Sequence, residues 1–196
     1  DAPGIWHLDN FGNKLIATIA DGASFEWDSD GSTSTRATAI TSAPTASRLS
    51  VVSTPDRHLV YFGTETTIGT TSTQDDMYIR WSDQEDINTY TPTATNTAGT
   101  QRIADGTRIV GAIRGRDAIY VWTDNALFIM RFVGAPFTFS FQQVGTGCGL
   151  IGKNAAVEVD GSAYWMSDNG FFRYTGKLES LPCLVEDYVF DDLNTV

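Results

Sequence analysis

Two acidic segments are the first places where the side chains could do chemistry. In Asp28-Ser29-Asp30-Gly31-Ser32, oxygen-bearing side chains alternate as they do at the start of a calcium-binding loop. The full loop also needs a third ligand before the glycine and a bidentate glutamate near its twelfth position, where this chain has Ala39. We therefore interpret the segment as a polar turn.

The second acidic segment contains Asp83, Glu85 and Asp86, which follow Trp81 closely. Such a group could hold a cation, or it could supply the paired carboxylates that hydrolyse glycosidic bonds. The sequence offers neither a set of partner ligands nor a setting that would raise a carboxyl pKa. A solvated loop, or the cap of a single helical turn, is the simpler expectation.

Other reactive residue types are scarce. The only two histidines, His7 and His58, cannot form a three-histidine zinc site, and each is expected to be an ordinary polar residue in a strand. Cys148 and Cys183 either pair or remain as two buried thiols. The glycine-rich segment 145–149 is not followed by a helix that could bind phosphate at its N-terminus. Walker loops, nucleophile elbows and dinucleotide fingerprints are missing, so we predict no enzyme, no cofactor and no metal site.

Length and charge narrow the possible partners. The chain has 196 residues, 41% of them hydrophobic, which is enough for a packed core. Its 13 Lys and Arg against 24 Asp and Glu give a net charge of −11, which disfavours tight binding to nucleic acid or to an anionic membrane. Since the chain starts with Asp1 rather than Met, we expect that a segment has been removed or that the chain is part of a longer polypeptide.

Hairpin patterns recur along the chain. Threonine and aromatic residues favour strands, and Asp, Asn and Gly between them favour tight turns. The expected hairpins pair residues 14–19 with 23–27, 118–122 with 126–130, 162–166 with 171–174 and, across a polar loop, 57–63 with 77–81. Further apolar segments lie at 50–52, 109–113 and 155–159, and long loops are expected at 27–46 and 83–106.

A unit of three or four strands therefore repeats about every 45 to 50 residues, which favours propeller blades. The prediction is an all-β chain, a β-propeller-like array of about four antiparallel blades that is part of a larger propeller. The candidate repeats are residues 1–46, 47–98, 99–146 and 147–182. Residues 183–196 are expected to form a short connector helix, since Leu184, Val185, Tyr188 and Val189 lie on one helical face. A β-sandwich is the alternative fold.

One ordered set of motifs resembles a known family. The segment Met77–Asp86 with Tyr90-Thr91-Pro92 is similar to the "RWSD" stretch of virion proteins in tailed bacteriophages, and the similarity covers about residues 50–194. The relatives are the packaged-DNA stabilisation proteins, or tail hub and nozzle proteins, of short-tailed phages. The matching positions are Arg80, Trp81, Ser82, Asp83, Pro92, Trp122, Asp124, Gly134, Pro136, Gly149, Gly152 and Trp165.

The resemblance implies a structural protein of the virion tail that is made in the cytoplasm of a host bacterium. It implies a homo-oligomeric ring below the portal, other tail and portal proteins as partners, only transient and non-specific DNA passage, and no membrane. Members of the family are usually longer, so the chain is expected to be a fragment of the propeller region. The charge of −11 suggests an acidic channel wall that repels phosphates.

Two other functions remain open at this stage. The first is a carbohydrate-binding or glycan-cleaving propeller that recognises the host surface, because the chain has five Trp residues that could stack on sugars. The second is a β-sandwich interaction module. Packing between sheets is the simpler explanation for the Trp residues.

Overall fold

The computed structural model describes residues 4–54, 56–191 and 193, and in this part of the chain the fold is all-β with one short helix. Sixteen strands form four separate four-stranded antiparallel sheets. In every sheet the strands are neighbours in chain order, so each sheet is a simple meander. None of the described helices is long and apolar enough to cross a membrane.

The sheets follow one another along the chain. The first contains β1 (Trp6–Phe11), β2 (Lys14–Ile19), β3 (Ser24–Asp28) and β4 (Thr38–Ala39). The second contains β5 (Ser47–Val52), β6 (Leu59–Thr64), β7 (Tyr78–Trp81) and β8 (Gly99–Arg102), with a 3₁₀ turn η1 (Thr71–Thr73) after β6. The third contains β9 (Ile109–Arg114), β10 (Ile119–Thr123), β11 (Ala126–Gly134) and β12 (Thr138–Thr146). The fourth contains β13 (Ala156–Val159), β14 (Ser162–Ser167), β15 (Gly170–Tyr174) and β16 (Leu178–Leu181), and α1 (Glu186–Asp191) follows it.

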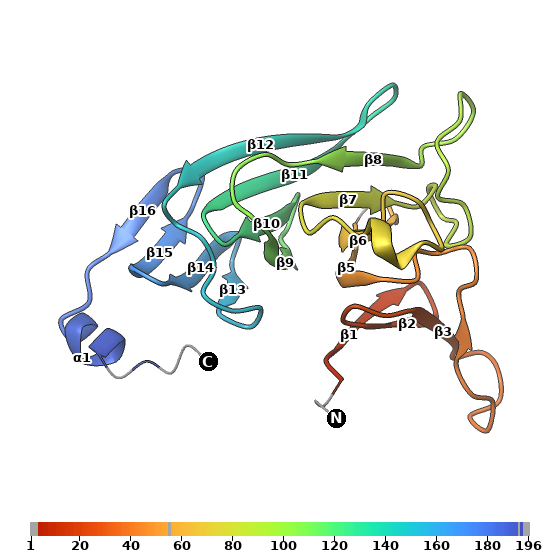
Figure 1. Cartoon of the computed structure of the whole chain (residues 1–196), viewed down its shortest axis with the longest axis horizontal. Helices are drawn as coiled ribbons and strands as arrows, with labels where there is room; N and C mark the ends of the chain where they lie inside the picture. The colour runs from red at the N-terminus through yellow and green to blue at the C-terminus, as the bar shows by residue number, and fades with distance from the viewer. Residues whose placement is uncertain (1–3, 55, 192, 194–196) are drawn as a thin grey trace.

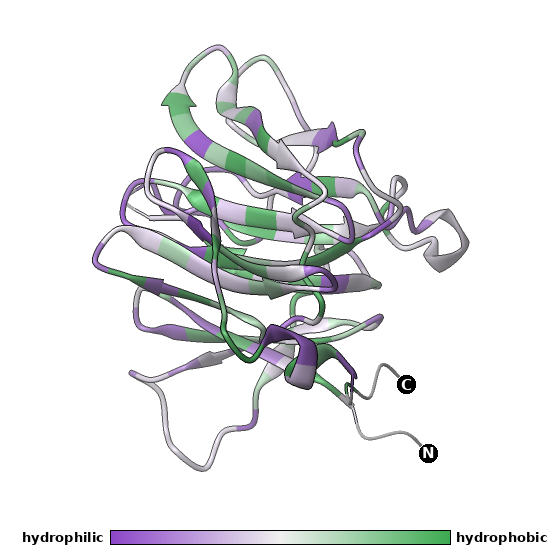
Figure 2. Ribbon diagram, turned by 90° about the vertical axis from the view of Figure 1, so that its left-hand side faces the viewer, coloured by the Kyte–Doolittle hydropathy of each residue, from purple (hydrophilic) through white to green (hydrophobic). Residues whose placement is uncertain are grey.

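The four sheets are arranged as an arc. Figure 1 shows β1, β5, β9 and β13, the first strand of each sheet, near the centre, with the later strands of each sheet farther out. The same four strands make most of the contacts between successive sheets, to which β2 and β6 also contribute. In Figure 2 the sheets stack one on another. The described sheets do not close into a ring, and they are four separate sheets rather than the two facing sheets of a sandwich.

Three apolar layers fill the spaces between the sheets. Ile16, Val52 and Leu59 lie between the first and second sheets, and are 0–1% exposed. The middle layer joins the second and third sheets, where Trp81 meets Phe139 edge-on with ring centroids 5.3 Å apart. The third apolar layer joins the third and fourth sheets. Strand alternation explains the layers, because successive side chains point to opposite faces of a sheet. In β6 and β10 both faces are apolar and buried, so these strands contribute to the layers on both sides of their sheets.

The two ends of the stack also have apolar faces, but the described chain does not cover them in the same way. On the outer face of the first sheet, strand register brings together Trp6, Leu8, Leu15, Ala17, Ile19, Phe25 and Trp27. Leu8 is 65% exposed. The outer face of the fourth sheet carries Val157, Val159, Tyr164, Met166, Phe171 and Leu181. Only part of it is covered by α1, whose Phe190 ring lies 5.7 Å from that of Phe171.

The structure corrects several expected boundaries. Strands β4 and β8 lie inside the two expected loops, and β8 pairs with β7, so the second sheet runs to Arg102 instead of ending at residue 98. His58 lies just before β6 and is fully buried, rather than being an ordinary polar residue of a strand. The connector helix is shorter than expected, and Leu184 and Val185 precede it.

Candidate functional site

The Arg80–Asp83 segment lies at the end of β7, where it ties together parts of the second sheet and its loops. The Arg80 side chain is buried, and its Nη2 donates to the carbonyl oxygen of Thr66 (2.8 Å) while Nη1 donates to that of Tyr90 (3.3 Å). Trp81 Nε1 donates to the carbonyl oxygen of Thr97 at 2.8 Å. Both side chains therefore hold the loops that follow β6 and β7 against the second sheet.

Ser82 and Asp83 continue this set of ties. Ser82 Oγ accepts the backbone N–H of Leu59 (3.0 Å) and donates to the carbonyl oxygen of Asp83 (2.8 Å). Asp83 Oδ1 accepts the backbone N–H of Thr97 (2.8 Å), the Thr97 hydroxyl (2.6 Å) and the backbone N–H of Gln84 (2.8 Å). Burial acts to raise the pKa of Asp83, but the hydrogen bonds from Thr97 and Gln84 outweigh it and lower the pKa.

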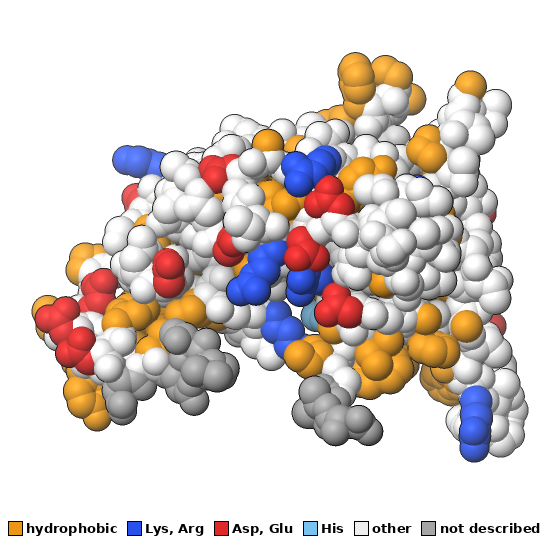
Figure 3. Space-filling model, viewed as in Figure 1, with side chains coloured by type: hydrophobic (Ala, Val, Ile, Leu, Met, Phe, Trp, Pro, Cys, Tyr) orange, Lys and Arg blue, Asp and Glu red, His pale blue; other side chains and the backbone are white. Residues whose placement is uncertain are grey.

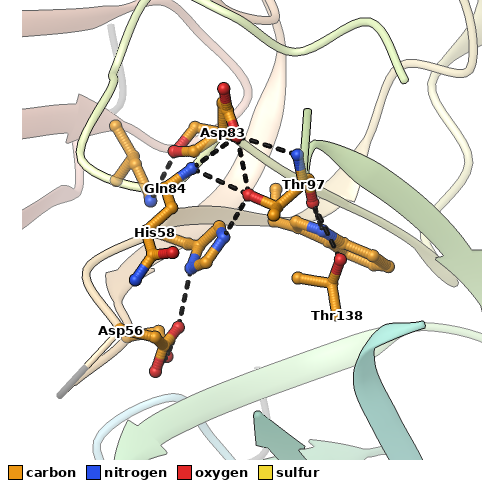
Figure 4. Close-up of polar contacts among 10 residues, drawn as sticks. Asp56, His58, Asp83, Gln84, Thr97 and Thr138 are labelled. Carbon is orange, nitrogen blue, oxygen red and sulfur yellow. Dashed lines mark hydrogen bonds and ion pairs between the residues drawn. The ribbon is translucent and has the colours of Figure 1, made fainter. Parts of the chain in front are cut away.

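His58 connects this cluster to a buried acid, Asp56 (Figure 4). Its Nδ1 lies 2.7 Å from Asp56 Oδ2, and its Nε2 lies 2.9 Å from Thr97 Oγ1. Ser53 Oγ donates to both oxygens of Asp56, at 2.9 and 2.8 Å. Asp56, His58 and Thr97 follow one another as the acid, imidazole and hydroxyl of a catalytic triad do. The direction of the hydrogen bonds decides whether Thr97 could act as a nucleophile.

The proton placement argues against an activated nucleophile. Thr97 donates its one hydroxyl hydrogen to Asp83, so its oxygen accepts a hydrogen bond from His58 Nε2. A nucleophilic hydroxyl would instead donate to the imidazole. The side chains of His58 and Asp56 are only 0% and 1% exposed, so substrate has no access to them. The cluster is a polar tie inside the second sheet.

Asp124 makes the same kind of contact between β10 and the start of the third sheet. Its Oδ1 accepts the backbone N–H of Thr107 (2.7 Å), and its Oδ2 accepts the Thr107 hydroxyl. Burial acts to raise the pKa of Asp124, and the hydrogen bonds from Thr107 and from the backbone N–H of Arg108 lower it overall. Trp122-Thr123-Asp124 thus repeats Trp81-Ser82-Asp83, both in sequence and in what the acid binds.

The remaining matched positions are dispersed. Trp122 and Trp165 meet edge-on with centroids 5.4 Å apart, and Trp165 Nε1 donates to the carbonyl oxygen of Cys148 at 2.8 Å. Gly149 packs so closely that a Cβ would lie 2.2 Å from the carbonyl oxygen of Asp124, whereas a Cβ on Gly152 would meet nothing within 4 Å. The exposed or loop-tip positions are Pro92, Gly134 and Pro136. The twelve positions therefore do not form one site.

The acidic residues that were weighed as candidate ligands or catalytic groups have local structural contacts. Asp83 binds Thr97, Glu85 forms an exposed ion pair with Arg57 (2.9 Å), and Asp86 accepts the hydroxyl of Thr89 (2.7 Å). The described residues contain no cluster of His, Cys, Asp and Glu that could hold a metal ion. In the Asp28–Ser32 turn, the Asp30 backbone N–H donates to Asp28 Oδ1 at 2.9 Å.

The two cysteines do not pair in this structure. Burial raises the pKa of the Cys148 thiol. Cys183 is only partly buried. The glycine-rich segment beside Cys148 is a packing feature, because a Cβ on Gly145 would lie 2.3 Å from a methyl carbon of Leu178.

A cavity at the centre of the arc is the feature that the sequence did not predict. Its volume is about 280 Å³, and all four sheets or the segments leading into them line it. The lining includes His7, Arg48, Arg108 and Lys153, with Asp21 as the one acid. Figure 3 looks onto this face, where basic side chains (blue) and acidic ones (red) gather near the middle of the molecule. The lining of this cavity is therefore not acidic throughout, although the net charge of −11 had suggested an acidic channel wall.

These central residues carry no sequence signal of their own, since they are single basic residues separated by 41 or more positions. The acid–threonine contacts had one usable signal, the repeated Trp-Ser/Thr-Asp, but Thr97 lies in a polar loop with many threonines. No family model matches the chain, and a search of curated proteins finds no significant match either.

Proposed function

We propose that the chain is an arc of a β-propeller and serves as a structural, non-enzymatic part of a bacteriophage tail hub or nozzle. The observation that carries the propeller is the radial order of the strands. Each sheet is a four-stranded antiparallel meander, and the first strand of every sheet lies near the centre (Figure 1). Propeller blades have this construction.

The apolar outer faces of the end sheets support a larger assembly. Within the stack, faces of the same kind pack against a neighbouring sheet and form the three apolar layers. The outer faces of the first and fourth sheets have no such neighbour in the described chain, and Leu8, Val157 and Val159 are at least half exposed there. Large exposed apolar faces of this type mark contact surfaces. Further sheets would bury both faces and continue the propeller.

The contacts of the motif residues favour a structural function. Arg80, Trp81, Ser82, Asp83 and Asp124 each bind backbone groups of a neighbouring segment. The order of these motifs is what resembles tail hub and nozzle proteins. In that setting the chain would sit in a homo-oligomeric ring below the portal, beside other tail and portal proteins, and DNA would pass it only transiently.

The tail assignment is tested on virus particles that contain the protein. An antibody raised against the exposed loop 28–37 should label the tail of intact virions in electron microscopy. The label should lie on the side of the tail that faces away from the capsid. Light scattering should show that the longest polypeptide containing this chain forms rings. Label on fibres or on the capsid surface, or a monomeric parent, would contradict the proposal. Specific binding or cleavage of host glycans would favour the carbohydrate alternative.

A further inference from the structure

Each of the four sheets, or the segment leading into it, places one basic side chain around the central cavity. His7 is the second residue of β1 and Arg48 is the second residue of β5, while Arg108 directly precedes β9 and Lys153 lies just before β13. The positions are therefore roughly equivalent in the four units. The whole chain has a net charge of −11, so the basic side chains gathered at the cavity are opposite in sign to the chain as a whole.

The cavity has more positive than negative charge. Arg48 is held by Asp76 through two hydrogen bonds, of 2.7 and 2.6 Å, so its charge is largely balanced. Arg108 and Lys153 have no ion-pair partner among the residues that the structure describes. Asp21 is the one acid in the cavity lining. Like charges that converge on one cavity repel each other, and a bound anion relieves that repulsion.

We propose that the central cavity binds a phosphate group, held by Arg108 and Lys153 together with His7 and Arg48. A phosphate presents several oxygens and up to two negative charges, so it suits donors that approach from different sheets. The cavity volume of about 280 Å³ is many times the ~10–15 Å³ that admits one water molecule, so a phosphate enters with water around it. The site does not depend on the tail assignment.

His7 provides a readout that is specific to this site. Burial and the nearby Lys153 lower the pKa of His7, so the empty site favours the neutral imidazole. The charged groups that line the cavity with it are Arg48, Arg108, Lys153 and Asp21. A phosphate among them adds negative charge and raises the pKa of His7, so binding takes up a proton. The pKa of His7 should therefore be higher with phosphate bound than without it.

The test is a calorimetric titration of the full chain with inorganic phosphate, with chloride adjusted to keep the ionic strength constant. We expect saturable binding at one site per chain. R108Q and K153Q should each weaken it by about tenfold or more, as expected for a lost charged hydrogen bond. The matched control is K177Q, which removes an exposed lysine in the turn between β15 and β16 and should leave the affinity unchanged. Unfolding curves of all three variants establish that each is folded.

Proton NMR of the His7 ring supplies the second measurement. At a phosphate concentration that just saturates the native chain, the His7 titration should move to higher pH, and it should move less in K153Q. The absence of saturable binding, an equal loss in K177Q, or an unmoved His7 titration would each overturn the proposal. A short DNA duplex distinguishes the source of the phosphate. Competition between duplex and inorganic phosphate identifies a nucleic-acid backbone as ligand, and phosphate binding without competition identifies a small phosphate compound.

Discussion

Asp83 and Thr97 are joined by two hydrogen bonds to a single carboxylate oxygen, one from the Thr97 backbone N–H (2.8 Å) and one from its hydroxyl (2.6 Å). The loop between them leaves the second sheet after β7 and returns at β8. Asp124 closes the connection into the third sheet through Thr107 in the same way. One acid at the end of a Trp-containing strand thus fixes the path of a connection in two successive sheets.

The first prediction concerns the pH dependence of this contact. D83N should lower the free energy of unfolding by about 1 kcal/mol at pH 7, because the amide is a weaker acceptor than the carboxylate and the site is partly open to water. The folded-state pKa of Asp83 is lowered, so its contribution is present above the ordinary value of about 3.9 and disappears as the pH falls through the lowered pKa.

Urea unfolding of D83N and the native chain at several pH values measures this difference, which should shrink steadily below about pH 4. E85Q is the control, because Glu85 makes only an exposed ion pair with Arg57 and should change stability little. A D83N effect that is independent of pH would show that the charge of Asp83 does not stabilise the loop.

The second prediction compares two glycines of the same segment. G149A should destabilise the chain by about 2 kcal/mol or more, or prevent folding, because the new methyl group would overlap the Asp124 backbone. G152A should change stability by less than about 0.5 kcal/mol, since nothing lies within 4 Å of its added carbon. Thermal unfolding and soluble yield measure both. Equal effects of the two variants would contradict the close packing at Gly149.

The third prediction separates a hydrogen bond from aromatic packing. Trp122 and Trp165 share one apolar layer, but Trp165 Nε1 has a carbonyl partner and Trp122 Nε1 has none in the part of the chain that the structure describes. W165F should therefore destabilise the chain by about 1 kcal/mol more than W122F. Urea unfolding followed by circular dichroism gives the comparison, and a larger loss in W122F would refute it.

The fourth prediction concerns the thiols. Cys183 should react with an alkylating reagent in the native chain, while Cys148 should react only after unfolding, because it is fully buried and its pKa is raised. Mass spectrometry of peptides after brief labelling at pH 8 measures both residues. C183S should remove the fast reaction completely. Fast labelling of Cys148 in the native chain would mean that the third apolar layer opens readily.

The strands that sequence analysis identified are those with their own apolar pattern. The segment 119–123 reads Ile-Tyr-Val-Trp-Thr and all five side chains are buried. By contrast, β8 reads Gly-Thr-Gln-Arg and β4 contains two exposed residues. These edge strands form because a neighbouring strand offers hydrogen bonds, which is information from the tertiary fold rather than from local composition.

The polar contacts were hidden for a related reason. Asp83 and Thr97 look like loop residues in the sequence, and only the return of the chain at β8 brings them together. His58 was expected to be an ordinary strand residue, yet two acids and a threonine surround it. The basic residues of the cavity come from the first strands of two sheets and from the segments leading into the other two, so no spacing along the chain links them.

The three separate apolar layers imply that the molecule need not unfold as one cooperative unit. An array of stacked units loses its end units at lower free-energy cost than its interior, because an end unit breaks only one interface. Amide hydrogen exchange should accordingly be slowest in β6 and β10, which lie in the second and third sheets, and faster toward β2 and β14. If further sheets packed on the two end faces, the first and fourth sheets would become interior units of the stack. Amide hydrogen exchange would then slow most in these two sheets.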